Sequence, residues 1–272
     1  MPVTRLFVEG HLDAEILTKI LNGDPVVERR GPKSALDAQT KSYREYDRLN
    51  VGYLRDRDFD FEPPEEHDVP VRDSKEGDFG WRWSRHEMEN YLLEPSVLLS
   101  VFPHTAIDYW AEHLTQVAER ILFYQAARWT IGQTRIAYPA WYHLETRPQL
   151  NELRLPADLS EFACRLWCEA SVNTFAERVA RSMNPEDSGR KFDHYFNRLS
   201  GLSDDAAEVL RWFSGKDLLA GFPDSVLGIC RVENAGSLRA TVRDWICSNP
   251  EAAIGCLPEF RVLSERLRSA VQ

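Results

Sequence analysis

The chain has 272 residues, 43% of them hydrophobic, and a formal net charge of −10 at pH 7. This length supports one large domain or a domain with an appendage, and the negative charge argues against a protein that coats DNA without specificity. No apolar run reaches the roughly 18 residues of a membrane helix, and the start "MPVTRLF" lacks the basic and apolar segments of a signal peptide, so we expect a soluble, cytoplasmic protein.

Strand and helix patterns alternate over the first part of the chain. Apolar runs predict strands, and segments with apolar residues three and four apart predict helices. In chain order, these strand, helix, strand, helix and strand segments are 3–8, 11–22, 25–29, 31–49 and 50–56. A β-α-β-α-β order implies a parallel sheet with right-handed crossovers.

A long loop and a further strand come next. Residues 59–80 are rich in acid, proline and glycine and are predicted to form a loop, of a length that is usually functional or mobile. Residues 81–85 alternate as a strand does. Helical spacing then runs from residue 86 until Pro95 breaks it.

The rest of the chain has helical character throughout. Amphipathic stretches predict helices over 107–132, 159–183, 204–222 and 235–271. We therefore expect an α/β protein in two parts. The first is an α/β domain over residues 1–100, with a parallel sheet flanked by helices, and the second is a mostly helical region over residues 101–272.

Two carboxylates follow the first predicted strand. Glu9 lies at the end of that strand, and Gly10 permits a sharp turn. Asp13 lies in the first turn of the helix, where backbone N–H groups favour negative charge. Because parallel sheets bind ligands at the carboxyl ends of their strands, we expect both side chains to point into one crevice.

A second pair of carboxylates follows the third predicted strand. Asp56 and Asp58 are two residues apart, and such residues face the same side of an extended chain. If the first and third strands are neighbours, this pair meets Glu9 and Asp13, and a cation is needed to neutralise the cluster. Oxygen ligands suit Mg²⁺ or Mn²⁺. The alternatives are a capping carboxylate for the first pair and a solvated turn for the second.

Three segments carry a resemblance to a known family. The segments "LFVEGHLDAEIL" (6–17) and "VGYLRDRDFDF" (51–61) resemble the Toprim domain, the metal-dependent catalytic domain of topoisomerases, primases and certain nucleases. The later "RHEMENYLLEP" (85–95) resembles the Glu-Asn-Tyr-Leu segment of the OLD-family nucleases. The chain is similar to the small stand-alone Toprim proteins, some of which act in anti-phage defence.

The resemblance assigns roles to the acids. Glu9 corresponds to the strand-end Toprim glutamate, Asp56 and Asp58 to the Asp-x-Asp pair, and Asp13 to the acid that such nucleases add after the glutamate. It implies a first metal ion held by Glu9, Asp56 and Asp13. Catalytic roles fall to Glu9, Asp56 and Asp58.

Two later residues complete the implied site. Glu89 resembles a ligand that holds a second ion together with Asp58, with Glu87 in reserve; the alternative for Glu89 is a helix-start carboxylate. The segment "RWFSGKDLLAGF" (211–222) lacks the spacing of a P-loop. In the resembled nucleases a lysine from such a segment reaches the active site, which gives Lys216 a catalytic role in stabilising charge on the phosphate. A solvated lysine after a capped helix start is the alternative.

A metal-dependent endonuclease is the function that this resemblance implies. Two divalent ions about 4 Å apart can activate water and stabilise the leaving oxygen of a phosphodiester. The substrate is DNA or RNA, and the negative charge favours a limited, structured one such as a tRNA. A catalytically silent Toprim-fold regulatory or interaction subunit is the alternative. Primase-like nucleotidyl transfer lacks support from any zinc-binding segment.

The resemblance also implies partners. OLD-family nucleases carry an ABC-type ATPase, and no Walker motif follows the acids of this chain. We therefore expect a separate ABC-type ATPase that acts in trans. The aromatic-rich helical region is expected to supply an interface for that ATPase or for a homodimer.

Overall fold

The computed structural model describes residues 2–47, 49–73, 79–137, 157–179 and 185–269. Its strands form one sheet in the order β2-β1-β3-β5-β4. Their bounds are β1 (Arg5–Val8), β2 (Val26–Arg29), β3 (Val51–Arg55), β4 (Val71–Arg72) and β5 (Gly80–Arg82). β1 pairs in parallel with β2 and β3, β3 pairs in parallel with β5, and only the edge strand β4 is antiparallel among these pairings. The predicted α/β class with a mostly parallel sheet is confirmed.

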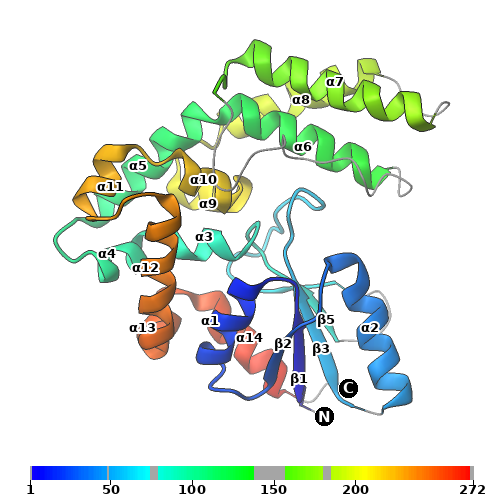
Figure 1. Ribbon diagram of the computed structural model, residues 1–272, viewed down its shortest axis with the longest axis vertical. Helices are drawn as coiled ribbons and strands as arrows, with labels where there is room; N and C mark the ends of the chain where they lie inside the picture. The colour runs from blue at the N-terminus through cyan, green and yellow to red at the C-terminus, as the bar shows by residue number, and fades with distance from the viewer. Residues whose placement is uncertain (1, 48, 74–78, 138–156, 180–184, 270–272) are drawn as a thin grey trace.

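Two helices follow the first two strands and cover opposite faces of the sheet. They are α1 (His11–Ile20) and α2 (Lys33–Tyr46), and Figure 1 shows α1 on one side of the strands and α2 on the other. Leu6 and Val8 of β1 enter the large core that includes α1, while Phe7 packs with Leu36 of α2. This alternation is the period of two that a strand buried on both faces requires.

Helices make up most of the remaining described chain. In the part that precedes residue 138 they are α3 (Met88–Leu92), α4 (Pro95–Val101), α5 (Ile107–Arg120) and α6 (Leu122–Ala137). Those that follow are α7 (Glu161–Val179), α8 (Pro185–Ser200), α9 (Ala206–Trp212), α10 (Gly215–Gly221), α11 (Asp224–Ile229), α12 (Ala235–Ser248), α13 (Pro250–Cys256) and α14 (Pro258–Arg268). None of the helices in the described residues combines the length and apolar character that a membrane span needs.

Several expected elements differ from the structure. The stretches 204–222 and 235–271 are helical as expected, but each is divided into shorter helices. The single helix expected over 107–132 is wrong: the chain leaves helical geometry at Ile121, and no glycine or proline marks the break. The loop expected over 59–80 contains β4, a two-residue strand too short to show a pattern. The strand expected over 81–85 is shorter and ends at Arg82. The break at Pro95 is confirmed, since Pro95 begins α4.

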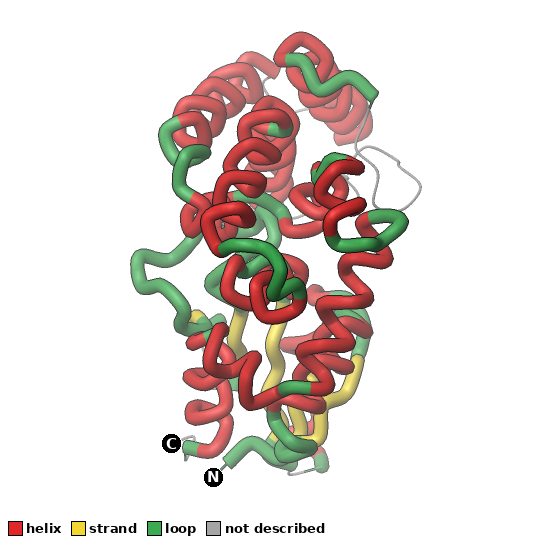
Figure 2. Tube along the Cα trace, turned by 90° about the vertical axis from the view of Figure 1, so that its left-hand side faces the viewer, coloured by secondary structure: helices red, strands yellow, loops and turns green. Residues whose placement is uncertain are grey.

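The last helix returns to the sheet. The N–H group of Val3 donates to the carbonyl of Leu267 in α14 at 2.9 Å, and both termini lie at the sheet end of the molecule (Figures 1 and 2). Buried residues from Val3 to Leu267 belong to one hydrophobic core. The helical part therefore shares its core with the sheet, and the division at residue 100 stays a prediction.

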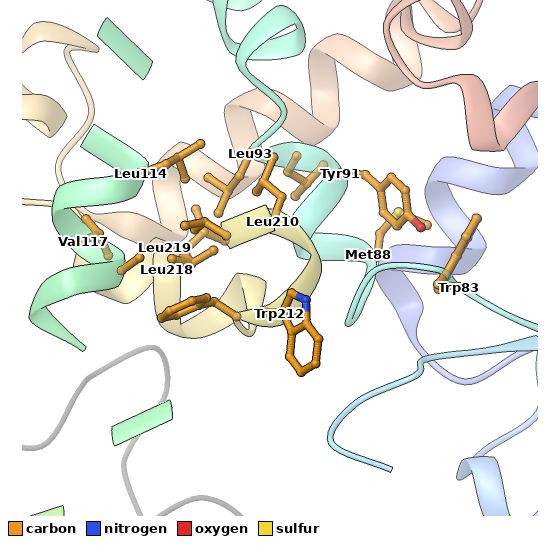
Figure 3. Packing of buried hydrophobic residues seen from close by; sticks show 14 of the residues in the cluster. Trp83, Met88, Tyr91, Leu93, Leu114, Val117, Leu210, Trp212, Leu218 and Leu219 are labelled. Atoms are coloured by element: carbon orange, nitrogen blue, oxygen red, sulfur yellow. The ribbon is translucent and has the colours of Figure 1, made fainter. Parts of the chain in front are cut away.

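Two short helices, α9 and α10, pack against helices from both parts of the chain. α9 and α10 pack their leucines, among them Leu210, Leu218 and Leu219, against the apolar sides of α3–α4 and α5, as Figure 3 shows. Arg57, which is fully buried, donates to the carbonyls of Ser84 and Arg211. These contacts hold the end of α9 near the carboxyl end of β3.

Candidate metal centre

Three neighbouring strands bring acidic side chains to one edge of the sheet. Glu9 follows β1, Asp56 follows β3, and the segment that leads to Glu87 follows β5. Because β1, β3 and β5 are adjacent and parallel, their carboxyl ends open at the same edge, where parallel sheets hold ligands. The expectation that the first and third strands are neighbours is confirmed.

The carboxylates of Asp56, Asp58 and Glu87 lie close enough together to hold a metal ion. One oxygen from each lies within 4.8 Å of the other two. Asp58 does not reach this group along an extended chain, as the two-residue spacing suggested; its φ is +49°, a left-handed conformation that aspartate tolerates better than most residues. The His86 carbonyl accepts hydrogen bonds from the N–H groups of Arg57 and Asp58 at 3.0 and 2.9 Å, which holds this turn against the segment that carries Glu87.

The start of α10 holds the Glu87 carboxylate. Ser214 Oγ donates to Glu87 Oε1 at 2.7 Å, and the backbone N–H of Lys216 donates to the same oxygen at 2.9 Å. The Lys216 ammonium donates to Oε2 at 2.6 Å. Sequence reasoning placed Glu89 with the second ion and kept Glu87 in reserve, whereas the structure groups Glu87 with the two aspartates.

A cavity of about 360 Å³ is lined by Asp56, whereas Asp58 and Glu87 are not among its lining residues. Its lining includes Glu9, Asp13, Asp56, Glu89 and Lys216, which the sequence had singled out at distant positions. The Lys216 side chain is 35% exposed, and its ammonium lies 3.7 Å from Glu89 Oε2, so it faces the acids instead of bulk solvent. The structure thus brings these residues together around one space.

Asp13 is buried at the first turn of α1. Trp83 Nε1 donates to Asp13 Oδ1 at 3.3 Å. A Cβ at residue 10 would lie 2.6 Å from Asp13 Oδ2, a distance that real Cβ contacts do not show. Gly10 is therefore needed not only for the turn but also because the Asp13 carboxylate folds back over it.

Burial and neighbouring charges set the ionisation of the site. Burial raises the pKa of Asp13, and it raises the pKa of Glu89 to about 7. Burial and the neighbouring aspartates hold the pKa of Asp56 well above its usual value. Burial also opposes the charges on Glu87 and Lys216, but their attraction outweighs it, so the pKa of Glu87 is lowered and that of Lys216 is raised well above the usual value.

These features fit a divalent cation. Within the described residues, Asp56 Oδ1 is buried and has no hydrogen-bond partner, which is costly for a carboxylate oxygen unless another ligand supplies the contact. The donors are all carboxylate oxygens, the ligand type that Mg²⁺ and Mn²⁺ prefer. Asp56, Asp58 and Glu87 are the residues that would hold such an ion.

Asn90 joins the acid-bearing helix α3 to the start of α10. Its Nδ2 donates to the carbonyls of Leu210 and Phe213 at 2.9 and 2.8 Å. Its Oδ1 accepts from the N–H groups of Glu87 and Gly215 at 3.2 and 3.1 Å. The amide thus makes all four hydrogen bonds available to it, and it fixes the distance between Glu87 and the α10 start.

Sequence reasoning missed three contributors to the site. Ser214 was considered only as a helix cap, yet it also donates to Glu87. Asn90 was read only as part of a family-like segment. Arg239 Nη1 contacts Glu89 Oε1 at 3.3 Å, and nothing in the sequence links positions 150 residues apart.

Comparisons with known proteins add no name to this site. No model of a known protein family matches the chain. A search of curated proteins finds no significant match. The functional conclusion therefore depends on the residues and their arrangement.

Proposed function

We propose that the chain is a divalent-metal-dependent nuclease of the Toprim type that cleaves phosphodiester bonds in DNA or RNA, with tRNA as one candidate substrate. The observation that carries the proposal is the placement of one carboxylate oxygen each from Asp56, Asp58 and Glu87 within 4.8 Å of one another. Asp56 also lines a cavity together with Lys216. These carboxylates would hold Mg²⁺ or Mn²⁺, which would supply a Lewis acid to the site.

The chain's own residues would position and neutralise a phosphodiester in the cavity. Lys216 is charged and faces the cavity, so its ammonium can donate to a non-bridging phosphate oxygen and stabilise the charge that develops there. Ser214 and the Lys216 N–H orient Glu87. Glu9, Asp13 and Glu89 surround the same cavity and extend the set of acids available for a second ion.

The setting of this activity follows from the resemblance described above. We propose that a separate ABC-type ATPase controls the nuclease as part of an anti-phage defence system. The negative net charge of the chain supports control of this kind, because a protein with little electrostatic attraction to long nucleic acid gains from a partner that delivers the substrate.

One observation favours the alternative, a silent Toprim-fold regulatory or interaction subunit. The Lys216 ammonium contacts Glu87 at 2.6 Å, so a side chain of the protein neutralises part of the acidic group. In a silent subunit that contact would be permanent. In a nuclease, Lys216→Met should lower the cleavage rate by about 10²–10³-fold, the usual effect of removing one stabilising donor.

Cleavage of plasmid, single-stranded DNA and total tRNA in Mg²⁺ or Mn²⁺ tests the proposal. Wild type is compared with Asp56→Asn and Glu87→Gln, and Asp205→Asn serves as a control because Asp205 is an exposed cap of α9. We expect cleavage by the wild type and the control and none by the two site variants. Equal cleavage by all four would refute the site, and metal binding without cleavage, even with the partner ATPase present, would favour the silent subunit.

A further inference from the structure

The cavity beside the metal centre has two walls of different character. One wall is the start of α1, from Gly10 to Asp13. The other is one face of α12, formed by Gly236, Arg239, Ala240 and Arg243. Apart from the contact of Arg239 with Glu89, neither the metal centre nor the Toprim resemblance uses this second wall.

The spacing along α12 gives that face two kinds of residue. Gly236 and Ala240 are four apart, and so are Arg239 and Arg243, so each pair lies on one side of the helix. The small residues leave the opening clear. The two arginines are separated by about 6 Å along the helix axis, so each guanidinium can contact a different phosphate.

The cavity carries charges of both signs on different elements. The α12 wall contributes Arg239 and Arg243, whereas the other lining elements contribute the acids Glu9, Asp13, Glu15, Asp56 and Glu89. Of these acids, Asp13 and Glu89 are buried and Glu15 is exposed. Two arginines beside an acidic, metal-binding group suit a strand whose reactive phosphate meets the metal while its neighbouring phosphates meet the arginines.

Both arginines are available for exchange. Arg239 contacts Glu89 at 3.3 Å with 40% of its side chain exposed. Arg243 contacts Glu15 at 3.3 Å and Asp244 at 2.7 Å, with 34% exposed. The ion pairs of Arg243 have exposed partners and contribute about 0–1 kcal/mol, whereas Glu89, the partner of Arg239, is only 5% exposed. A phosphate offers either arginine a bidentate partner in place of these carboxylates.

We propose that Arg239 and Arg243 bind the phosphates that flank the reactive phosphate of an unpaired nucleic-acid strand. The inference rests on the proposed nuclease function and adds the form of its substrate. A cavity of about 360 Å³ is near the lower end of ligand pockets, about 300–1,000 Å³. A space of this volume has room for one nucleotide unit and not for a base pair. Loops and single strands are therefore the expected targets.

Salt-dependent binding tests this proposal without cleavage. The probe is a fluorescein-labelled 12-nucleotide single-stranded DNA in Ca²⁺, shown on a gel to stay intact, with binding followed by anisotropy. Each lost phosphate contact should reduce the slope of log K against log salt by about 0.7. We expect that reduction for Arg243→Gln and Arg239→Gln, and a wild-type slope for Arg239→Lys, which keeps the charge.

Arg165→Gln is the matched control. Arg165 is 32% exposed and also pairs with two carboxylates, but it lies on α7 and does not line the cavity. Its slope should equal that of the wild type. Arg243→Gln removes contacts with exposed acids only, so it should fold normally even if Arg239→Gln, which strips Glu89 of a partner, does not.

Two results would overturn the proposal: an unchanged slope for Arg243→Gln, or no binding of the probe by wild type at low salt. Cleavage is scored separately on the same proteins. A reduced slope in a protein that does not cleave, even with the partner ATPase present, would support the phosphate contact and contradict the nuclease. Cleavage with unchanged slopes of log K against log salt would support the nuclease function and contradict the phosphate contact.

Discussion

Asn90→Asp is the substitution that most sharply tests how the site is assembled. The Asn90 side chain is fully buried and donates two hydrogen bonds from Nδ2, to the carbonyls of Leu210 and Phe213. An aspartate keeps the two acceptor contacts of Oδ1 but has no donor at the second position. The two carbonyls would then face a carboxylate oxygen.

The size of the effect follows from these two lost contacts. A buried polar group left without a partner costs about 1–3 kcal/mol, so two carbonyls cost about 2–6 kcal/mol. For a chain of this size, 1 kcal/mol corresponds to about 2–4 °C in melting temperature. We expect Asn90→Asp to melt roughly 4–24 °C below wild type and to bind Mn²⁺ more weakly, because Glu87 would lose its alignment with Ser214.

Asn234→Asp is the control, with the same change of chemistry and charge. Asn234 is the exposed N-cap of α12, and its Oδ1 accepts from the Ser237 N–H at 2.9 Å. Aspartate and asparagine cap helices about equally well, so its melting temperature should stay near that of wild type. Thermal unfolding of the three proteins decides the matter. If Asn90→Asp melts with Asn234→Asp, the proposed role of the amide is refuted.

Two further predictions concern packing and pH. A Cβ at residue 215 would lie 2.6 Å from the Glu89 carbonyl carbon, whereas one at Gly255 meets nothing within 4 Å. Gly215→Ala should therefore lose about 1–3 kcal/mol of stability, while Gly255→Ala should gain up to about 1 kcal/mol. Denaturant unfolding that gives both changes the same sign would contradict this prediction. Burial raises the pKa of Glu259, so the folded state holds that proton to a higher pH than the unfolded chain. Wild type should therefore lose stability relative to Glu259→Gln as pH rises from the ordinary glutamate pKa through the raised one, and parallel melting temperatures across that window would contradict the burial argument.

The sheet and its acids could be predicted from sequence because their signals are local. Apolar runs and helical spacing gave the β-α-β-α-β order, and the rule that ligands lie at the carboxyl ends of parallel strands placed Glu9 and Asp56 together. The edge strand β4 has two residues, too few for a periodic pattern. The helix break at Ile121 is not marked by a glycine or proline in the sequence.

The contacts across the site could not be predicted in the same way. Glu87 is the N-cap of α3 and Glu89 lies in its first turn. Contacts from Ser214 and Lys216, which are 127 and 129 residues away, hold Glu87 where it joins the aspartates. The pairing of Arg239 with Glu89 joins positions 150 residues apart. Such pairings depend on how α10 and α12 pack on α3, which single-sequence patterns do not encode.

The most direct test of the account is a Mn²⁺ titration followed by electron paramagnetic resonance of the free ion. Wild type and Asp205→Asn should each take up Mn²⁺ with saturation, while Asp56→Asn and Glu87→Gln should lose that uptake, because each removes one carboxylate of the group within 4.8 Å. Saturable binding that is equal in all four proteins, or absent from wild type, would contradict the claim that these carboxylates hold a divalent metal.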